Sequence, residues 1–107
     1  MQKVLVTIQH FHGCPNSPEL ISRVRKVITT FEQSVEYKEI LVESDEMAER
    51  MHFRGSPTLL INGEDFEYQP ELQHASLACR LYVNGLPTSE DIRKRIELVL
   101  NQKPIRR

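Results

Sequence analysis

The spacing of apolar residues along the chain predicts its first strand and its first helix. Val4, Leu5, Val6 and Ile8 dominate residues 3–10, and such a run predicts a strand buried on both faces. A long amphipathic helix is predicted to follow, because apolar residues recur there at helical spacing: Leu20, Ile21, Val24, Val27, Ile28 and Phe31. Ser17 is its expected N-cap, with Pro18 at the first helical position, because a residue before proline avoids the α region.

The middle of the chain predicts a second strand, a short helix and a hairpin. Residues 35–42 alternate and then turn apolar, which indicates the strand. Ser44 is a suitable N-cap for a helix through about His52. Residues 57–66 contain Asn-Gly, the pair that supplies both positive-φ residues of a type I′ turn, so they predict a β-hairpin.

The last third of the chain has a weaker pattern until its final helix. Residues 69–87 lack clear periodicity, although residues 78–83 are suited to a short strand. Thr88 is then expected to cap a helix, with Asp91 three residues on. Its inner stripe is Ile92, Ile96, Val99 and Leu100.

The predicted order is β-α-β-α-β-β-α. A strand–helix–strand opening implies a parallel crossover, and the closing hairpin makes the sheet mixed. We therefore predict an α/β fold with a mixed four-stranded sheet and helices on both faces. The 107 residues are expected to form one domain, 1–107, with an extended segment 69–87 before the last helix.

Charge and hydropathy narrow the classes of function. The formal net charge is −1, from 14 basic and 15 acidic residues spread along the chain. This balance provides no basic surface for nucleic acid or anionic lipid. No stretch approaches the ~20 apolar residues of a membrane span, and the N-terminal run is too short for a signal-peptide core. We therefore expect a cytoplasmic protein without nucleic-acid or membrane partners, whose thiols are kept reduced.

Cys14 is the first candidate for chemistry. It lies between the first predicted strand and the first long helix, where a helix N-terminus favours thiolate over thiol. The alternative is that Cys14 is a small buried hydrophobic residue. Its neighbours Gly13 and Pro15 argue against deep packing, so we expect a solvent-accessible thiol with a lowered pKa.

A resolving thiol must come from outside this motif, because Ser17 stands three residues after Cys14. Cys79 is the other cysteine of the chain, 65 positions further on. It either resolves Cys14 or is simply part of the core, and in the second case an external thiol serves. We predict that segment 69–87 folds back over the Cys14 end of the molecule, so that Cys79 can reach Cys14.

Two histidines precede Cys14 and suggest two further roles. His10, His12 and Cys14 alternate, so an extended chain projects them from one face. They are then a candidate site for Zn²⁺ or Cu(I). The milder role is electrostatic, since a nearby His12 imidazolium lowers a thiol pKa. If neither role applies, the two histidines are partly exposed and take no part in the site.

Three motifs resemble those of the thioredoxin-like superfamily. They are Gly13-Cys14-Pro15-Asn16 after the first strand, Gly55-Ser56-Pro57-Thr58 at the start of the hairpin, and the capped final helix. Together with Ala78-Cys79-Arg80-Leu81-Tyr82, they are similar to a group of small bacterial thioredoxin-like proteins. Some members of that group carry selenocysteine at the place of Cys14.

The resemblance implies a site and an activity. Pro57 would be cis and lie against Cys14, the nucleophile. Ser56, Pro57 and Thr58, with Pro15 and Ser17, would bind the substrate. In that superfamily, the backbone beside the proline binds the substrate or glutathione as an added strand.

The function implied is a thiol oxidoreductase without a cofactor, resolved by Cys79 or by an external thiol. Its substrate would be a thiol or disulfide, with glutathione or a partner protein as the other reactant. Two alternatives remain open at this point. One is a non-enzymatic protein that binds a soft metal or metalloid, and the other is a thioredoxin-like adaptor that binds peptides without chemistry.

Overall fold

The computed structural model describes residues 3–66, 76–79 and 85–101. The elements in chain order are β1 (Val4–His10), α1 (Asn16–Ile28), the short 3₁₀ helix η1 (Glu32–Ser34), β2 (Val35–Leu41), α2 (Asp45–Met51), β3 (Arg54–Ser56), β4 (Thr58–Ile61), β5 (Glu64–Asp65), β6 (Ser76–Cys79) and α3 (Ser89–Asn101). These bounds confirm the first two predicted strands, the three predicted helices and the hairpin.

The main sheet is four-stranded and mixed, in the order β2-β1-β4-β5. β1 runs parallel to β2, with Val4 opposite Val35, and antiparallel to β4, with Val6 opposite Ile61. β4 and β5 form the antiparallel hairpin. The fold is therefore α/β with the predicted kind of sheet. A separate parallel pair of β3 and β6 adds a second small sheet. β6 includes residues 78 and 79 of the short strand suggested for 78–83, but the sequence pattern predicted neither β3 nor this pairing.

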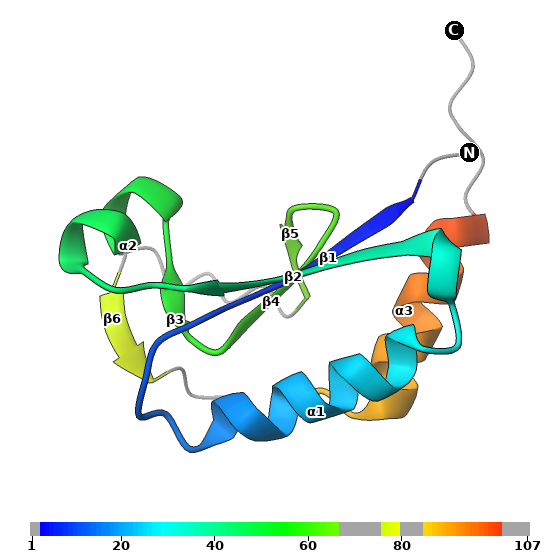
Figure 1. Ribbon diagram of the computed structural model, residues 1–107, viewed down its shortest axis with the longest axis horizontal. Helices are drawn as coiled ribbons and strands as arrows, with labels where there is room; N and C mark the ends of the chain where they lie inside the picture. The colour runs from blue at the N-terminus through cyan, green and yellow to red at the C-terminus, as the bar shows by residue number, and fades with distance from the viewer. Residues whose placement is uncertain (1–2, 67–75, 80–84, 102–107) are drawn as a thin grey trace, which may run out of the picture.

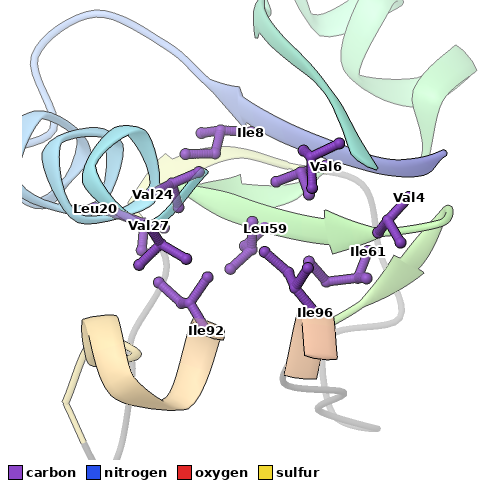
Figure 2. Packing of buried hydrophobic residues seen from close by; sticks show 11 residues of the cluster. Val4, Val6, Ile8, Leu20, Val24, Val27, Leu59, Ile61, Ile92 and Ile96 are labelled. Carbon is purple, nitrogen blue, oxygen red and sulfur yellow. The ribbon is translucent and has the colours of Figure 1, made fainter. Parts of the chain in front are cut away.

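The helices cover the sheet from both sides. Figure 1 shows α1 and α3 on one side, and α2 on the other side towards one end of β2. Figure 2 shows the main core, where α1 and α3 face the central strands. Its fully buried members are Val6, Ile8, Leu20, Val24, Leu59, Ile92 and Ile96. A smaller cluster of Val42, Ala48 and Phe53 packs beneath α2.

Local chemistry explains where α2 and α3 begin. The Ser44 hydroxyl accepts a hydrogen bond from the Met47 N–H at 3.1 Å, and Thr88 accepts one from the Asp91 N–H at 3.0 Å. Both residues satisfy an N–H group of the first turn that has no partner within the helix. Both predicted caps are confirmed. Among the described residues, no helix has the length and apolar character needed to cross a membrane.

The predicted cap of α1 is wrong. α1 begins at Asn16 with Pro15 as its N-cap, and no side chain caps it. Ser17 lies inside the first turn and is buried. Its hydroxyl is hydrogen-bonded to Ser56, so it does not cap the helix. Pro18 fits the first turn without loss, since the N–H it lacks has no helical acceptor there.

The hairpin turn also anchors the central strand. Asn62 and Gly63 have φ values of 52° and 83°, as a type I′ turn requires. Asn62 accepts a hydrogen bond from the Leu5 N–H at 2.8 Å and donates its own N–H to the Leu5 carbonyl at 2.7 Å. The side chain that permits the turn therefore also joins it to β1.

We predict that Ile96→Ala lowers the free energy of unfolding by about 2–5 kcal/mol, because Ile96 is fully buried between α3 and the sheet. Leu98→Ala on the same helix is the matched control. Leu98 is 58% exposed, so its truncation is expected to cost no more than about 0.5 kcal/mol. Chemical denaturation measures both values. Equal losses in the two variants would contradict this packing of α3.

Candidate functional site

Cys14 lies in the short connection between β1 and α1. Gly13 has φ +99°, a conformation that glycine adopts far more readily than other residues, and it turns the chain just before Cys14. The Ser17 N–H then donates to the Cys14 carbonyl at 3.2 Å as α1 begins. The first helical turn therefore starts directly after the cysteine.

The side chain of Cys14 is buried, with only 4% of the residue exposed. The expectation of a solvent-accessible thiol is wrong for this structure. Gly13 and Pro15 set the backbone conformation around Cys14, and Pro15 itself is exposed. They do not determine which side chains pack against Cys14. Cys14 is disulfide-bonded here, and no described cysteine is free. Its expected lowered thiol pKa stays a prediction.

The Gly55-Ser56-Pro57-Thr58 segment lies next to this connection. The Ser56–Pro57 peptide bond is cis, the form that the resemblance implies. The Ser56 hydroxyl accepts a hydrogen bond from the Phe11 N–H at 3.1 Å and is hydrogen-bonded to the Ser17 hydroxyl at 2.9 Å. Three segments, the end of β1, the first turn of α1 and the end of β3, thus meet at one buried hydroxyl.

Ser56, Pro57 and Thr58 are themselves buried, so their side chains do not form an open groove wall in this structure. The Thr58 hydroxyl donates to the Gly55 carbonyl at 2.6 Å, which holds the segment in its turn. Pairing with β6 occupies an edge of β3. This is the strand that ends at Ser56, directly before Pro57.

That pairing also places the backbone of Cys79. β3 and β6 run parallel, with Arg54 opposite Ser76 and Ser56 opposite Cys79, and an irregularity between the two pairs. Cys79 therefore lies on the strand next to the serine that bonds to Ser17. Residues 80–83 of the predicted strand, and most of segment 69–87, lie outside the described residues.

A hollow of about 670 Å³ opens beside Cys14. The connection after β1, helix α1 and strand β2 all contribute to its wall. Its polar and charged lining includes His10, His12, Ser17, Arg25, Lys26 and Glu39. The sequence interpretation missed the last three. For Lys26, the signal that could have found it is its helical spacing with residues 18 and 22, which places the three along one side of α1. Glu39 lies on β2, and no local pattern connects it to this side of α1.

Glu39 organises the charged end of this hollow. Its carboxylate accepts hydrogen bonds from Arg25 Nε at 2.7 Å and from the Tyr37 hydroxyl at 2.7 Å. The hydrogen bond to Glu39 raises the pKa of Arg25, and burial together with Glu39 raises the pKa of Tyr37. Burial lowers the pKa of His10 from its ordinary 6.5, with His12 acting in the same direction and Glu39 opposing.

The described residues do not form the candidate metal site of His10, His12 and Cys14. In the part of the chain that the structure describes, no three His, Cys, Asp or Glu side chains are grouped closely enough to hold a metal ion. His12 is exposed and lines the same hollow as Cys14. Its predicted effect on the thiol pKa applies to the reduced protein and stays a prediction.

Comparison of the chain with protein-family models and with curated proteins finds no match. The function must therefore be argued from the site itself.

We predict that Ser17 and Ser56 are energetically coupled. Ser56→Ala removes the acceptor of the buried Phe11 N–H and the partner of Ser17, so it is expected to cost about 1–3 kcal/mol of unfolding free energy. A double-mutant cycle with Ser17→Ala should give a coupling of about 0.5–3 kcal/mol. Denaturant titrations of the four oxidised proteins measure it. Strictly additive losses would show that the two hydroxyls do not depend on each other.

Proposed function

We propose that this chain is a thioredoxin-like thiol oxidoreductase that exchanges a disulfide at Cys14, with Cys79 as the partner cysteine. One observation carries the proposal. Cys14 is in a disulfide, and the chain contains one other cysteine. A small α/β protein that both buries and oxidises a cysteine at the start of a helix has the parts needed for thiol–disulfide exchange.

The arrangement of elements supports the thioredoxin-like part of the proposal. β1 is central in the order β2-β1-β4-β5, parallel to one neighbour and antiparallel to the other. Cys14 follows β1, and the cis Ser56–Pro57 bond joins β3 to β4. These are the places that the resemblance assigns to the nucleophile and to the proline beside it.

Backbone pairing supports Cys79 as the partner. Cys79 lies opposite Ser56 in the β3–β6 ladder, and Ser56 is hydrogen-bonded to Ser17. Ser17 in turn donates its N–H to the carbonyl of Cys14. Both cysteines are thus linked to the same pair of serines. Ser17 stands where a Cys-x-x-Cys protein has its second thiol, so β6 supplies that thiol from a distant part of the sequence.

The chemistry follows from these positions. An external thiolate attacks Cys14 Sγ, the disulfide breaks, and Cys79 leaves as a thiolate that takes up a proton. A second thiol attacks the external sulfur of the mixed disulfide and releases the Cys14 thiolate. The two external thiols become one disulfide, and the protein gains their two electrons. The partial positive charge at the start of α1, directly after Cys14, is suited to stabilise that thiolate.

The reverse reaction tests the proposal. Reduced protein treated with oxidised glutathione is expected to become an intramolecular disulfide, because Cys79 attacks the mixed disulfide formed at Cys14. Cys79→Ser should instead accumulate the mixed disulfide on Cys14, while Cys14→Ser should react only slowly. Intact mass and peptide mapping after acid quenching distinguish these products. Rapid modification of Cys79 in the Cys14→Ser variant would mean that Cys79, and not Cys14, is the attacking thiol. Wild-type protein that never forms the intramolecular disulfide would exclude Cys79 as the resolving thiol.

A further inference from the structure

β2 forms one edge of the main sheet. It lies at the end of the order β2-β1-β4-β5, and among the described residues its only neighbouring strand is β1. The Val42 N–H, directly after β2, donates to the His10 carbonyl at 2.7 Å and so points towards β1. Backbone groups of successive residues in a strand point to opposite sides, so Tyr37 and Glu39 direct theirs away from β1. This row of N–H and C=O groups is an edge to which a further strand can pair.

We propose that the partner of this edge is a second copy of the same chain. The two β2 strands would run antiparallel about a two-fold axis and join the two sheets into one. The axis passes through Tyr37, so that Tyr37 lies opposite Tyr37 of the second copy. Glu36 then lies opposite Lys38 of the second copy, and the symmetry repeats this pair. The proposal concerns a surface outside the thiol site and does not depend on the proposed oxidoreductase activity.

Charge distinguishes this register from its neighbours. Glu36 and Lys38 are both exposed, and they stand two residues apart on the same face of β2. With the axis at Tyr37, both cross-strand pairs join opposite charges, which stabilises an antiparallel ladder. Moving the axis by one residue in either direction places Lys38 opposite Lys38 or Glu36 opposite Glu36. Like charges directly opposite each other are destabilising, so the charge pattern favours the Tyr37 register.

The backbone fits the same register. Val35, Tyr37 and Glu39 are the residues whose backbone groups point outward, and this axis pairs Tyr37 with Tyr37 and Val35 with Glu39. Each of these is then a hydrogen-bonded pair of the antiparallel ladder. Glu36 and Lys38 fall at the non-hydrogen-bonded positions, where opposing side chains are closest. Their charges therefore meet at the positions where they interact most strongly.

The two faces of β2 contribute in different ways. On the side that faces α1, the two half-buried Tyr37 rings become neighbours, and aromatic cross-strand pairs stabilise a sheet. Glu39 on that side is already held by Arg25 and by the Tyr37 hydroxyl, so its charge is compensated within its own chain. Glu36 and Lys38 lie on the opposite face, and neither lines the hollow beside Cys14. Their charges can therefore be exchanged without altering the thiol site.

Sedimentation velocity of the oxidised full-length protein, at concentrations up to about 1 mM, measures the association. A ladder over residues 35–39 is small for a protein interface, so we expect a weak, reversible dimer. Mass spectrometry under non-reducing conditions checks that no disulfide links the two copies. Lys38→Glu places like charges at both cross-strand pairs and should raise the dissociation constant of the dimer by about tenfold or more. Glu36→Lys should have the same effect.

Restoring opposite charges should restore the dimer. In an equimolar mixture of the Lys38→Glu and Glu36→Lys proteins, each cross-strand pair again joins opposite charges, so the two variants should associate about as strongly as the wild type. The double variant Glu36→Lys/Lys38→Glu should do so by itself. Recovery in the mixture would also show that neither single variant had lost its fold. Lys94→Glu, at an exposed position on α3, makes the same change of charge and should leave association unchanged.

Two results would overturn the proposal. Wild-type protein that stays monomeric at every concentration would mean that the charges of β2 keep its edge unpaired. A dimer whose dissociation constant is the same in the wild type and in Lys38→Glu would mean that the copies associate through another surface. Either result leaves the oxidoreductase proposal standing, because that proposal is tested at Cys14 and Cys79.

Discussion

The buried hydrogen bond between the Ser17 and Ser56 hydroxyls holds the two halves of the site in register. It joins the first turn of α1 to the residue before Pro57, and the Phe11 N–H donates to the same Ser56 oxygen. Two hydroxyls removed from water lose much of their solvation, so each depends on the other as a partner. The connection that carries Cys14 lies between Phe11 and Ser17, and its two ends are thus fixed to one atom.

That constraint links the fold to the proposed chemistry. The main core of α1, α3 and the central strands fixes the helix axis, while the serine pair fixes the start of the helix against β3. β3 in turn pairs with β6, which brings the backbone of Cys79 to the same place. In the proposed function, thiol–disulfide exchange at Cys14 would therefore take place in a connection whose two ends are hydrogen-bonded to Ser56. Under the proposed function, an external thiol would approach from the hollow that Cys14 lines.

Sequence patterns predicted the features that depend on neighbouring residues. The Asn62-Gly63 turn and the Ser44 and Thr88 caps follow from positive φ and from unpaired N–H groups within a few residues. The same reasoning predicts Ser17 as a cap, but the Ser17 hydroxyl bonds to Ser56, 39 positions away. The burial of Cys14 and the β3–β6 pairing depend on equally distant contacts. No pattern of neighbouring residues indicates the burial of Cys14 or the β3–β6 pairing, so both became visible only in the three-dimensional structure.

A redox titration tests the central claim, that the Cys14 disulfide is a working one. The protein is equilibrated in thiol–disulfide buffers of graded potential, its free thiols are alkylated, and the reduced fraction is measured by mass. We expect one two-electron transition, with the ratio of reduced to oxidised protein changing tenfold per about 30 mV, and a midpoint above about −300 mV. A disulfide that stays oxidised to potentials well below about −300 mV is a structural cross-link, and that result would rule out a redox-active Cys14 disulfide.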